Sequence, residues 1–80
     1  MKEARRKKLG RRIAGLRAER GWSQQDLSDR VERSRSYISR LELGNVQEPQ
    51  IGAVERIAEC FGRDLTQLMD EAENIPLEDS

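Results

Sequence analysis

Six side chains between residues 34 and 40 are of types that read DNA bases. Two are arginines, three are serines and one is a tyrosine: Ser34, Arg35, Ser36, Tyr37, Ser39 and Arg40. An arginine can donate two parallel hydrogen bonds to O6 and N7 of guanine in the major groove, and a serine hydroxyl can bond several bases. We therefore take these six residues as candidate base-reading residues.

The same stretch carries the signals of a short helix over residues 34–42. Ser34 is a candidate N-cap because its hydroxyl can accept a hydrogen bond from a free amide of the first turn. Ile38 and Leu41 are spaced i, i+3, so they lie on one face of that helix. We expect this face to be buried, which leaves the arginines and serines on the outside.

Another short helix is predicted just before it, from residue 23 onward. Ser23 is a candidate N-cap, and Asp26 stands where a capping box is completed. Trp22 and Leu27 occupy the two positions of a hydrophobic staple. Leu27 and Val31 then repeat at i, i+4, the spacing of one helical face.

Only two residues separate the predicted helices. Glu32 and Arg33 lie between Val31 and the cap Ser34. A connection this short does not allow the helices to be collinear, so they must cross at a large angle. This is the helix-turn-helix pattern, in which the second helix enters the DNA major groove.

The chain resembles the phage-repressor or Cro-like helix-turn-helix family, also called XRE. The resemblance covers about residues 9–69 and implies an all-α, compact, lambda-repressor-like DNA-binding domain of five helices, usually acting as a dimer. The matching residues are Leu9, Ile13, Leu16, Arg17, Arg20, Gly21, Ser23, Gln24, Gln25, Leu27, Ser36, Tyr37, Ile38, Ser39, Glu42, Gly44, Pro49, Val54, Ile57, Ala58, Phe61 and Leu65.

The resemblance also implies roles for residues outside the second helix. An arginine and a glutamate at the positions of Arg17 and Glu42 form an ion pair in the family. A glutamine at the position of Gln24 contacts a DNA phosphate, and Gln25 is a possible neighbour in that role. We add Asn45, in the predicted loop 43–50, as a further contact to the DNA backbone.

Two positions in the turn depart from the family pattern. Glu32 stands where the family usually has glycine, and Arg33 stands where it usually has a small apolar residue. A non-glycine residue with positive φ costs on the order of 1 kcal/mol. We expect the Arg33 stem to lie along apolar surface and its guanidinium to reach water.

The chain divides into three parts by composition. Residues 1–8 are basic and form either a flexible arm or the first turns of a helix, residues 9–69 form the DNA-binding domain, and residues 70–80 form an acidic tail. As an arm, the N-terminal segment would contact DNA phosphates or a minor groove, whereas a frayed, solvated end is the alternative. Its candidate backbone contacts are Arg5, Arg6, Lys7 and Lys8.

Charge is distributed unevenly along a chain whose net charge is zero. Residues 1–45 contain 13 Lys and Arg against 6 Asp and Glu, and residues 46–80 contain 2 against 9. This +7 and −7 division predicts a basic face for a polyanion and an acidic part placed elsewhere.

Composition argues against an enzyme and against a membrane protein. The chain has one cysteine, Cys60, and no histidine, so the usual metal sites and nucleophile–base pairs cannot be assembled. We expect no cofactor and no metal. The chain also lacks a run of about 18 apolar residues, and a lone cysteine favours a reducing cytoplasm.

The sequence therefore predicts a sequence-specific regulator of transcription that binds double-stranded DNA as a homodimer on a pseudo-palindromic operator, and it leaves open repression or activation. The alternative is a protein-interaction module of the same fold, an antitoxin or anti-repressor, that binds a protein partner through its acidic C-terminal half.

Overall fold

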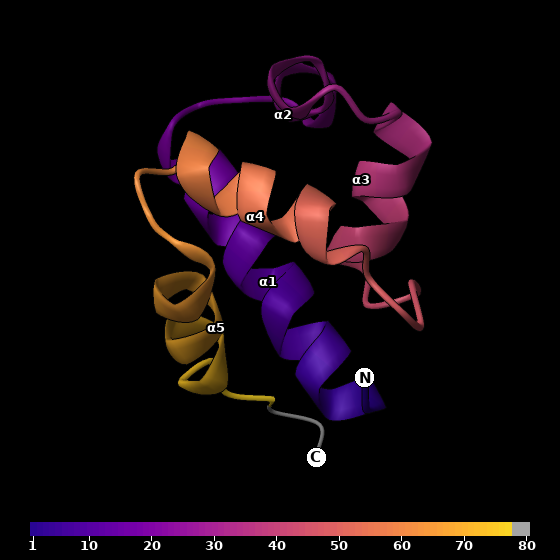
Figure 1. The fold of residues 1–80 in the computed structure, drawn as a ribbon, viewed down its shortest axis with the longest axis vertical. Helices are drawn as coiled ribbons and strands as arrows, with labels where there is room; N and C mark the ends of the chain where they lie inside the picture. The colour runs from indigo at the N-terminus through magenta and orange to yellow at the C-terminus, as the bar shows by residue number, and fades with distance from the viewer. Residues whose placement is uncertain (78–80) are drawn as a thin grey trace.

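Five helices and no strand make up residues 1–77, which are the residues that this computed structural model describes. The helices are α1 (Glu3–Glu19), α2 (Gln24–Val31), α3 (Arg35–Glu42), α4 (Ile51–Cys60) and α5 (Leu65–Glu73). The predicted five-helix, all-α fold is confirmed. Figure 1 shows α1 through the centre of the molecule, with α5 on one side of it and α3 on the other.

One apolar cluster holds the five helices together. It draws fully buried side chains from every helix, and α1 alone contributes three at i, i+4, i+7. The cluster consists of Leu9, Ile13, Leu16, Leu27, Val31, Ile38, Leu41, Val54, Ile57, Ala58, Phe61, Leu68 and Ala72. Among residues 1–77, no helix combines the length and apolar content needed to cross a bilayer.

Short-range hydrogen bonds set the starts of three helices. Ser23 and Asp26 form a full capping box: the Ser23 hydroxyl accepts from the Asp26 amide at 3.0 Å, and the Ser23 amide donates to the Asp26 carboxylate at 2.9 Å. The Ser34 hydroxyl accepts from the Tyr37 amide at 3.0 Å. Asp64 caps α5 in a second capping box. Helices α2 and α3 thus begin where the sequence predicts.

The basic N-terminal segment is helical from Glu3 onward, where helix α1 begins. Three of the basic side chains of α1 contact the acidic end of α5. Arg5 Nε donates to the Glu73 carboxylate at 3.0 Å, and Lys8 Nζ donates to the Glu73 carbonyl at 3.5 Å. Arg12 pairs with Glu71 at 2.7 Å.

The acidic C-terminal segment begins as part of the folded domain. The domain boundary expected at residue 69 falls inside α5, which continues to Glu73, and Ala72 is 2% exposed. Ile75 and Leu77 are half-buried. The end of the predicted tail, residues 78–80, lies outside the described residues.

Helices α1 and α3 approach each other closely at Gly10. A Cβ atom at this position would lie 2.4 Å from the Glu42 carbonyl oxygen and 2.5 Å from the Leu41 carbonyl oxygen. Both are backbone atoms, so the helices would have to separate to admit a methyl group. The absence of a side chain at Gly10 therefore sets the position of the C-terminal end of α3.

We predict that Gly10→Ala lowers the free energy of unfolding by about 1–3 kcal/mol, the usual cost of overpacking. Gly15→Ala is the matched control in the same helix, because nothing lies within 4 Å of a Cβ there. Since alanine is the better helix former, the control should gain roughly 0.5–1 kcal/mol. Urea unfolding of both variants checks this, and equal effects would contradict the close approach.

The stability of the α1–α5 contact should depend on pH through Glu71. Hydrogen bonds from Arg12, assisted by Arg63, lower the pKa of Glu71 below its usual 4.5 despite a smaller opposing effect of desolvation. The folded state thus binds fewer protons than the unfolded state between the two pKa values. The stabilisation is complete above pH 4.5 and is lost as the pH falls through the folded pKa.

We predict that Glu71→Gln is less stable than the original chain at neutral pH and that the difference shrinks below pH 4.5. Unfolding midpoints in urea, measured from pH 7 to pH 2.5, test this. A stability difference that does not change over this range would show that the charge of Glu71 is not what stabilises the contact.

Candidate nucleic-acid interface

The turn between α2 and α3 uses a left-handed residue that is not glycine. Glu32 has φ 56° and ψ 43°, and its amide donates to the Ser28 carbonyl, as does that of Arg33 at 3.2 Å. Ser28 itself is 2% exposed, so a small residue fills the crossing of the two helices. The positive φ carries a strain on the order of 1 kcal/mol for a residue with a Cβ.

A long-range contact holds this turn in place. The guanidinium of Arg56, on α4, forms an ion pair with the Glu32 carboxylate and reaches the Val31 carbonyl at 3.5 Å. Arg33 is half-buried, and its guanidinium donates to the Glu32 carbonyl at 3.2 Å. The two residues that depart from the family pattern are thus part of one hydrogen-bonded corner, and sequence reasoning did not identify Arg56.

The outward face of α3 forms a shallow hollow of about 280 Å³. It is lined by Arg35, Ser36, Ser39 and Arg40, and three of these are exposed while Ser39 is half-buried. The structure therefore brings four of the six candidate base readers together. Ser34 lies just before them, where its hydroxyl oxygen already accepts from the Tyr37 amide and its proton is left to donate.

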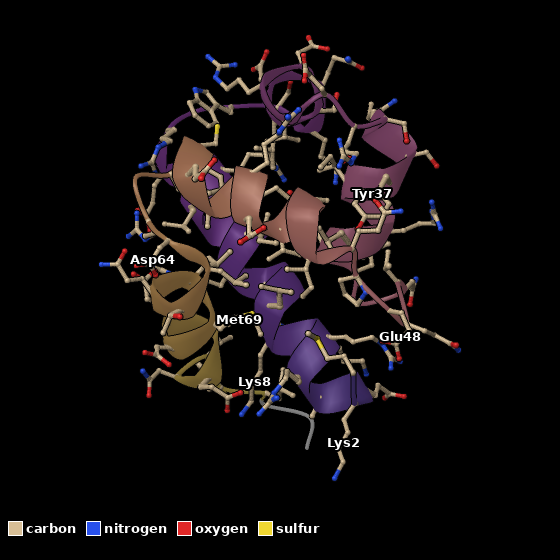
Figure 2. The ribbon with its side chains drawn as sticks, in the orientation of Figure 1. Lys2, Lys8, Tyr37, Glu48, Asp64 and Met69 are labelled. Carbon is tan, nitrogen blue, oxygen red and sulfur yellow. The ribbon has the colours of Figure 1, made fainter. Side chains whose placement is uncertain are left out.

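Tyr37 links α3 to α4. It is half-buried against the core, and its phenol oxygen accepts a hydrogen bond from the Gln50 amide at 3.3 Å. Figure 2 shows the ring between α3 and the start of α4. The Arg40 guanidinium lies 5.9 Å from the ring centroid. Tyr37 thus lies beside the Arg40 guanidinium, and its hydroxyl oxygen accepts from Gln50 while its proton is left to donate.

The arginines on the surface of α3 differ from the others in whether their side chains have polar partners. The chain has twelve arginines. Within residues 1–77, Arg35 and Arg40 have neither a hydrogen bond nor an ion pair from their side chains. The other ten all do: Arg5, Arg6, Arg11, Arg12, Arg17, Arg20, Arg30, Arg33, Arg56 and Arg63.

The expected ion pair between α1 and α3 is present. Arg17 donates to both carboxylate oxygens of Glu42, at 2.7 and 3.0 Å, and also to the Trp22 carbonyl at 2.8 Å. The hydrogen bond with Glu42 raises the pKa of Arg17. Glu42 is 9% exposed, so the pair fixes the end of α3 against α1 in a largely dry setting.

The two glutamines at the start of α2 are engaged within the chain. Gln24 Nε2 donates to Glu42 at 3.0 Å, and Gln25 Nε2 donates to Asp29 at 2.8 Å. Gln24 has a second amide N–H left to donate to a phosphate, whereas Gln25 Nε2 also donates to the Ser28 hydroxyl at 3.2 Å and so has both N–H groups engaged. Asn45 is exposed, and its backbone amide donates to the Arg40 carbonyl at 2.9 Å.

Four basic side chains of α1 were predicted to contact the DNA backbone, and all four have partners in the fold. Arg5 and Lys8 reach Glu73, as described above, and Lys7 pairs with Glu3 at 3.2 Å. Arg6 donates to the Gly44 carbonyl at 3.1 Å, so it positions the loop that follows α3. Sequence reasoning missed the contacts of Arg5, Arg6 and Lys8 because their partners lie 38 to 68 residues away, whereas Glu3 lies only four residues from Lys7.

The described residues offer little to catalysis. No group of three or more His, Cys, Asp or Glu side chains in residues 1–77 is arranged to hold a metal ion. Cys60 is a free, half-buried cysteine, and burial raises the pKa of its thiol against the opposing charges of Arg30 and Arg20. A thiol with a raised pKa is a poor nucleophile at neutral pH.

Comparison with known proteins gives a family model and relatives that are named as regulators. A family model described as a helix-turn-helix domain matches residues 8–72. The competence pilus inhibition repressor of Acinetobacter baylyi is 39% identical over 67 residues, which are 84% of this chain and 60% of that protein. The chain thus spans less than two thirds of the length of this curated relative.

Two solved structures share the fold. The clp gene regulator ClgR of Corynebacterium glutamicum superposes with a TM-score of 0.77 at 25% identity, covering 86% of this chain and 72% of that one. A SinR protein/SinI protein complex contains a chain that superposes with a TM-score of 0.74 at 28% identity, covering 88% of this chain and 69% of that one.

The strained turn gives a test of its own. In an Arg56→Ala background, we predict that Glu32→Gly raises the free energy of unfolding by roughly 0.5–1 kcal/mol, because glycine relieves the positive φ and no ion pair is left to lose. With Arg56 intact, the gain should be smaller by the free energy that the Arg56–Glu32 ion pair contributes. Urea unfolding of the original chain, the two single variants and the double variant measures both the strain and the ion pair. A loss of stability on Glu32→Gly in the Arg56→Ala background would refute the strain.

Proposed function

The chain belongs to the helix-turn-helix domain family, and from this premise we propose that it is a sequence-specific regulator of transcription with α3 as its recognition helix. The observation that carries the proposal is that, within residues 1–77, the side chains of Arg35 and Arg40 on the exposed face of α3 have neither a hydrogen bond nor an ion pair. An arginine already bound to a carboxylate would first have to break that ion pair. These two are free to bond base edges as soon as α3 enters a major groove.

Contacts to the DNA backbone follow from the elements around α3. We assign them to Asn45, to the spare amide donor of Gln24, and to free backbone amides at the start of α4, where Gln50 provides no side-chain cap. Gln25 would join them by exchanging one of its hydrogen bonds to Ser28 and Asp29 for a phosphate. Helix N-termini favour phosphates because their amides and dipole point toward the anion. Such contacts supply register and affinity but carry little sequence information.

We propose that two copies bind one operator. Recognition helices of a dimer enter successive major grooves about 34 Å apart on a pseudo-palindromic site. The chain measures 32 × 23 × 23 Å, so two adjacent copies fit that spacing. We place this activity in the cytoplasm, where the DNA is. By analogy with the Acinetobacter repressor, we expect it to repress transcription.

A second candidate function rests on the acidic half. Glu55 and Glu59 on α4 and Asp70 on α5 are exposed, and within residues 1–77 no partner binds their carboxylates. The SinR/SinI complex shows that a protein of this fold can be part of an assembly with another protein. A protein partner on this surface, as for an antitoxin or anti-repressor, would coexist with DNA on the opposite side.

Arg35→Ala tests the DNA-binding proposal. We predict a loss of roughly 1–3 kcal/mol on the preferred duplex, with relaxed discrimination at one position. Fluorescence anisotropy with the selected duplex and with random duplexes measures both effects. The matched control is Arg11→Ala, an exposed arginine of α1 that donates to the Pro76 carbonyl.

The control removes the same charge away from α3, so it should leave discrimination unchanged. If Arg35→Ala weakened binding to selected and random DNA equally, Arg35 would be a phosphate contact. The proposal as a whole fails if no duplex is enriched by repeated selection from a random library.

A further inference from the structure

We propose that each half of the operator carries two G·C base pairs, one read by Arg35 and the other by Arg40. This inference rests on the proposed function and specifies the DNA sequence that it requires. It depends on three properties of one helical face: which side chains discriminate between bases, which of them are free to do so, and how far apart they lie.

The first step is the composition of the face. The hollow on α3 is lined by two arginines and two serines. Adenine is recognised by asparagine or glutamine and cytosine by a carboxylate, whereas serine bonds several bases without strong preference. Only the two arginines can therefore impose a strong choice, and the base that matches a guanidinium in two parallel bonds is guanine.

The second step is availability. An arginine held by a carboxylate would exchange one strong hydrogen-bonded pair for another and gain little by binding a base. Arg35 and Arg40 have neither a carboxylate nor a carbonyl partner within residues 1–77, whereas each of the other ten arginines has one or both. The Tyr37 ring, tied to α4 through the Gln50 amide, lies 5.9 Å from the Arg40 guanidinium and limits its freedom on one side.

The third step is spacing. Arg35 and Arg40 are five residues apart, which is about 7.5 Å along a helix axis. Base pairs repeat about every 3.4 Å along DNA, so the two guanines should lie about two to three base pairs apart. The small side chains of Ser36 and Ser39 lie in the same hollow and leave room for both arginines.

The experiment begins with the duplex selected from a random library. The two most constrained guanines of a half-site are replaced, one at a time, by 7-deazaguanine, which lacks the N7 acceptor, and by hypoxanthine, which keeps O6 and N7 but lacks the minor-groove amino group. We expect each 7-deazaguanine to weaken binding about five- to a hundredfold. Hypoxanthine should leave the affinity within about twofold.

Arg35→Ala and Arg40→Ala then assign each guanine to its arginine. Alanine removes every donor to O6 and N7, whereas lysine could still bond both atoms. Arg11→Ala is the control for the lost charge. Each variant should lose sensitivity to 7-deazaguanine at one position and keep it at the other. Circular dichroism of both variants verifies the fold, because both substitutions are at exposed positions.

The outcomes separate this inference from the proposed function. A selected consensus without constrained guanines, or 7-deazaguanine effects that persist in both alanine variants, would overturn the inference while leaving a regulator that binds DNA. Failure to enrich any sequence would overturn the proposed function itself, and with it this inference.

Discussion

The position of α3 depends on the carboxylate of Glu42. It accepts hydrogen bonds from Arg17 on α1 and Gln24 at the start of α2, so three helices meet at one nearly buried group. A buried ion pair adds little net stability, because desolvation offsets its attraction, but losing one partner is costly. Its consequence is geometric: together with the close approach at Gly10, it sets the position of α3 relative to α1 and α2.

The basic first half and the acidic second half of the sequence partly neutralise each other in the folded chain. Much of the basic N-terminal segment neutralises the acidic end of α5, through Arg5 with Glu73 and Arg12 with Glu71. The basic surface left for a polyanion is therefore narrower than the +7 of the first half indicates. Arg35 and Arg40 belong to what is left, because within residues 1–77 their side chains have neither a hydrogen bond nor an ion pair.

Local patterns in the sequence determined the elements. Caps at Ser23 and Ser34 act over three residues, and the apolar repeats of α1, α2 and α3 act over one or two turns, so both can be read from the chain alone. The outward position of Arg35, Ser36, Ser39 and Arg40 follows from the same periodicity. The family resemblance added the Arg17–Glu42 pair, which links residues 25 apart and could not be derived from spacing.

Only the tertiary structure decided which polar groups are already engaged. It turned Arg6 from a predicted phosphate contact into a support for the loop at Gly44, and it placed Arg56 on the strained Glu32 turn. It also tied the Tyr37 hydroxyl to α4. Sequence fixes whether a side chain can donate or accept, whereas its partner depends on how helices far apart in the chain pack, and α1 and α5 meet only in the folded state.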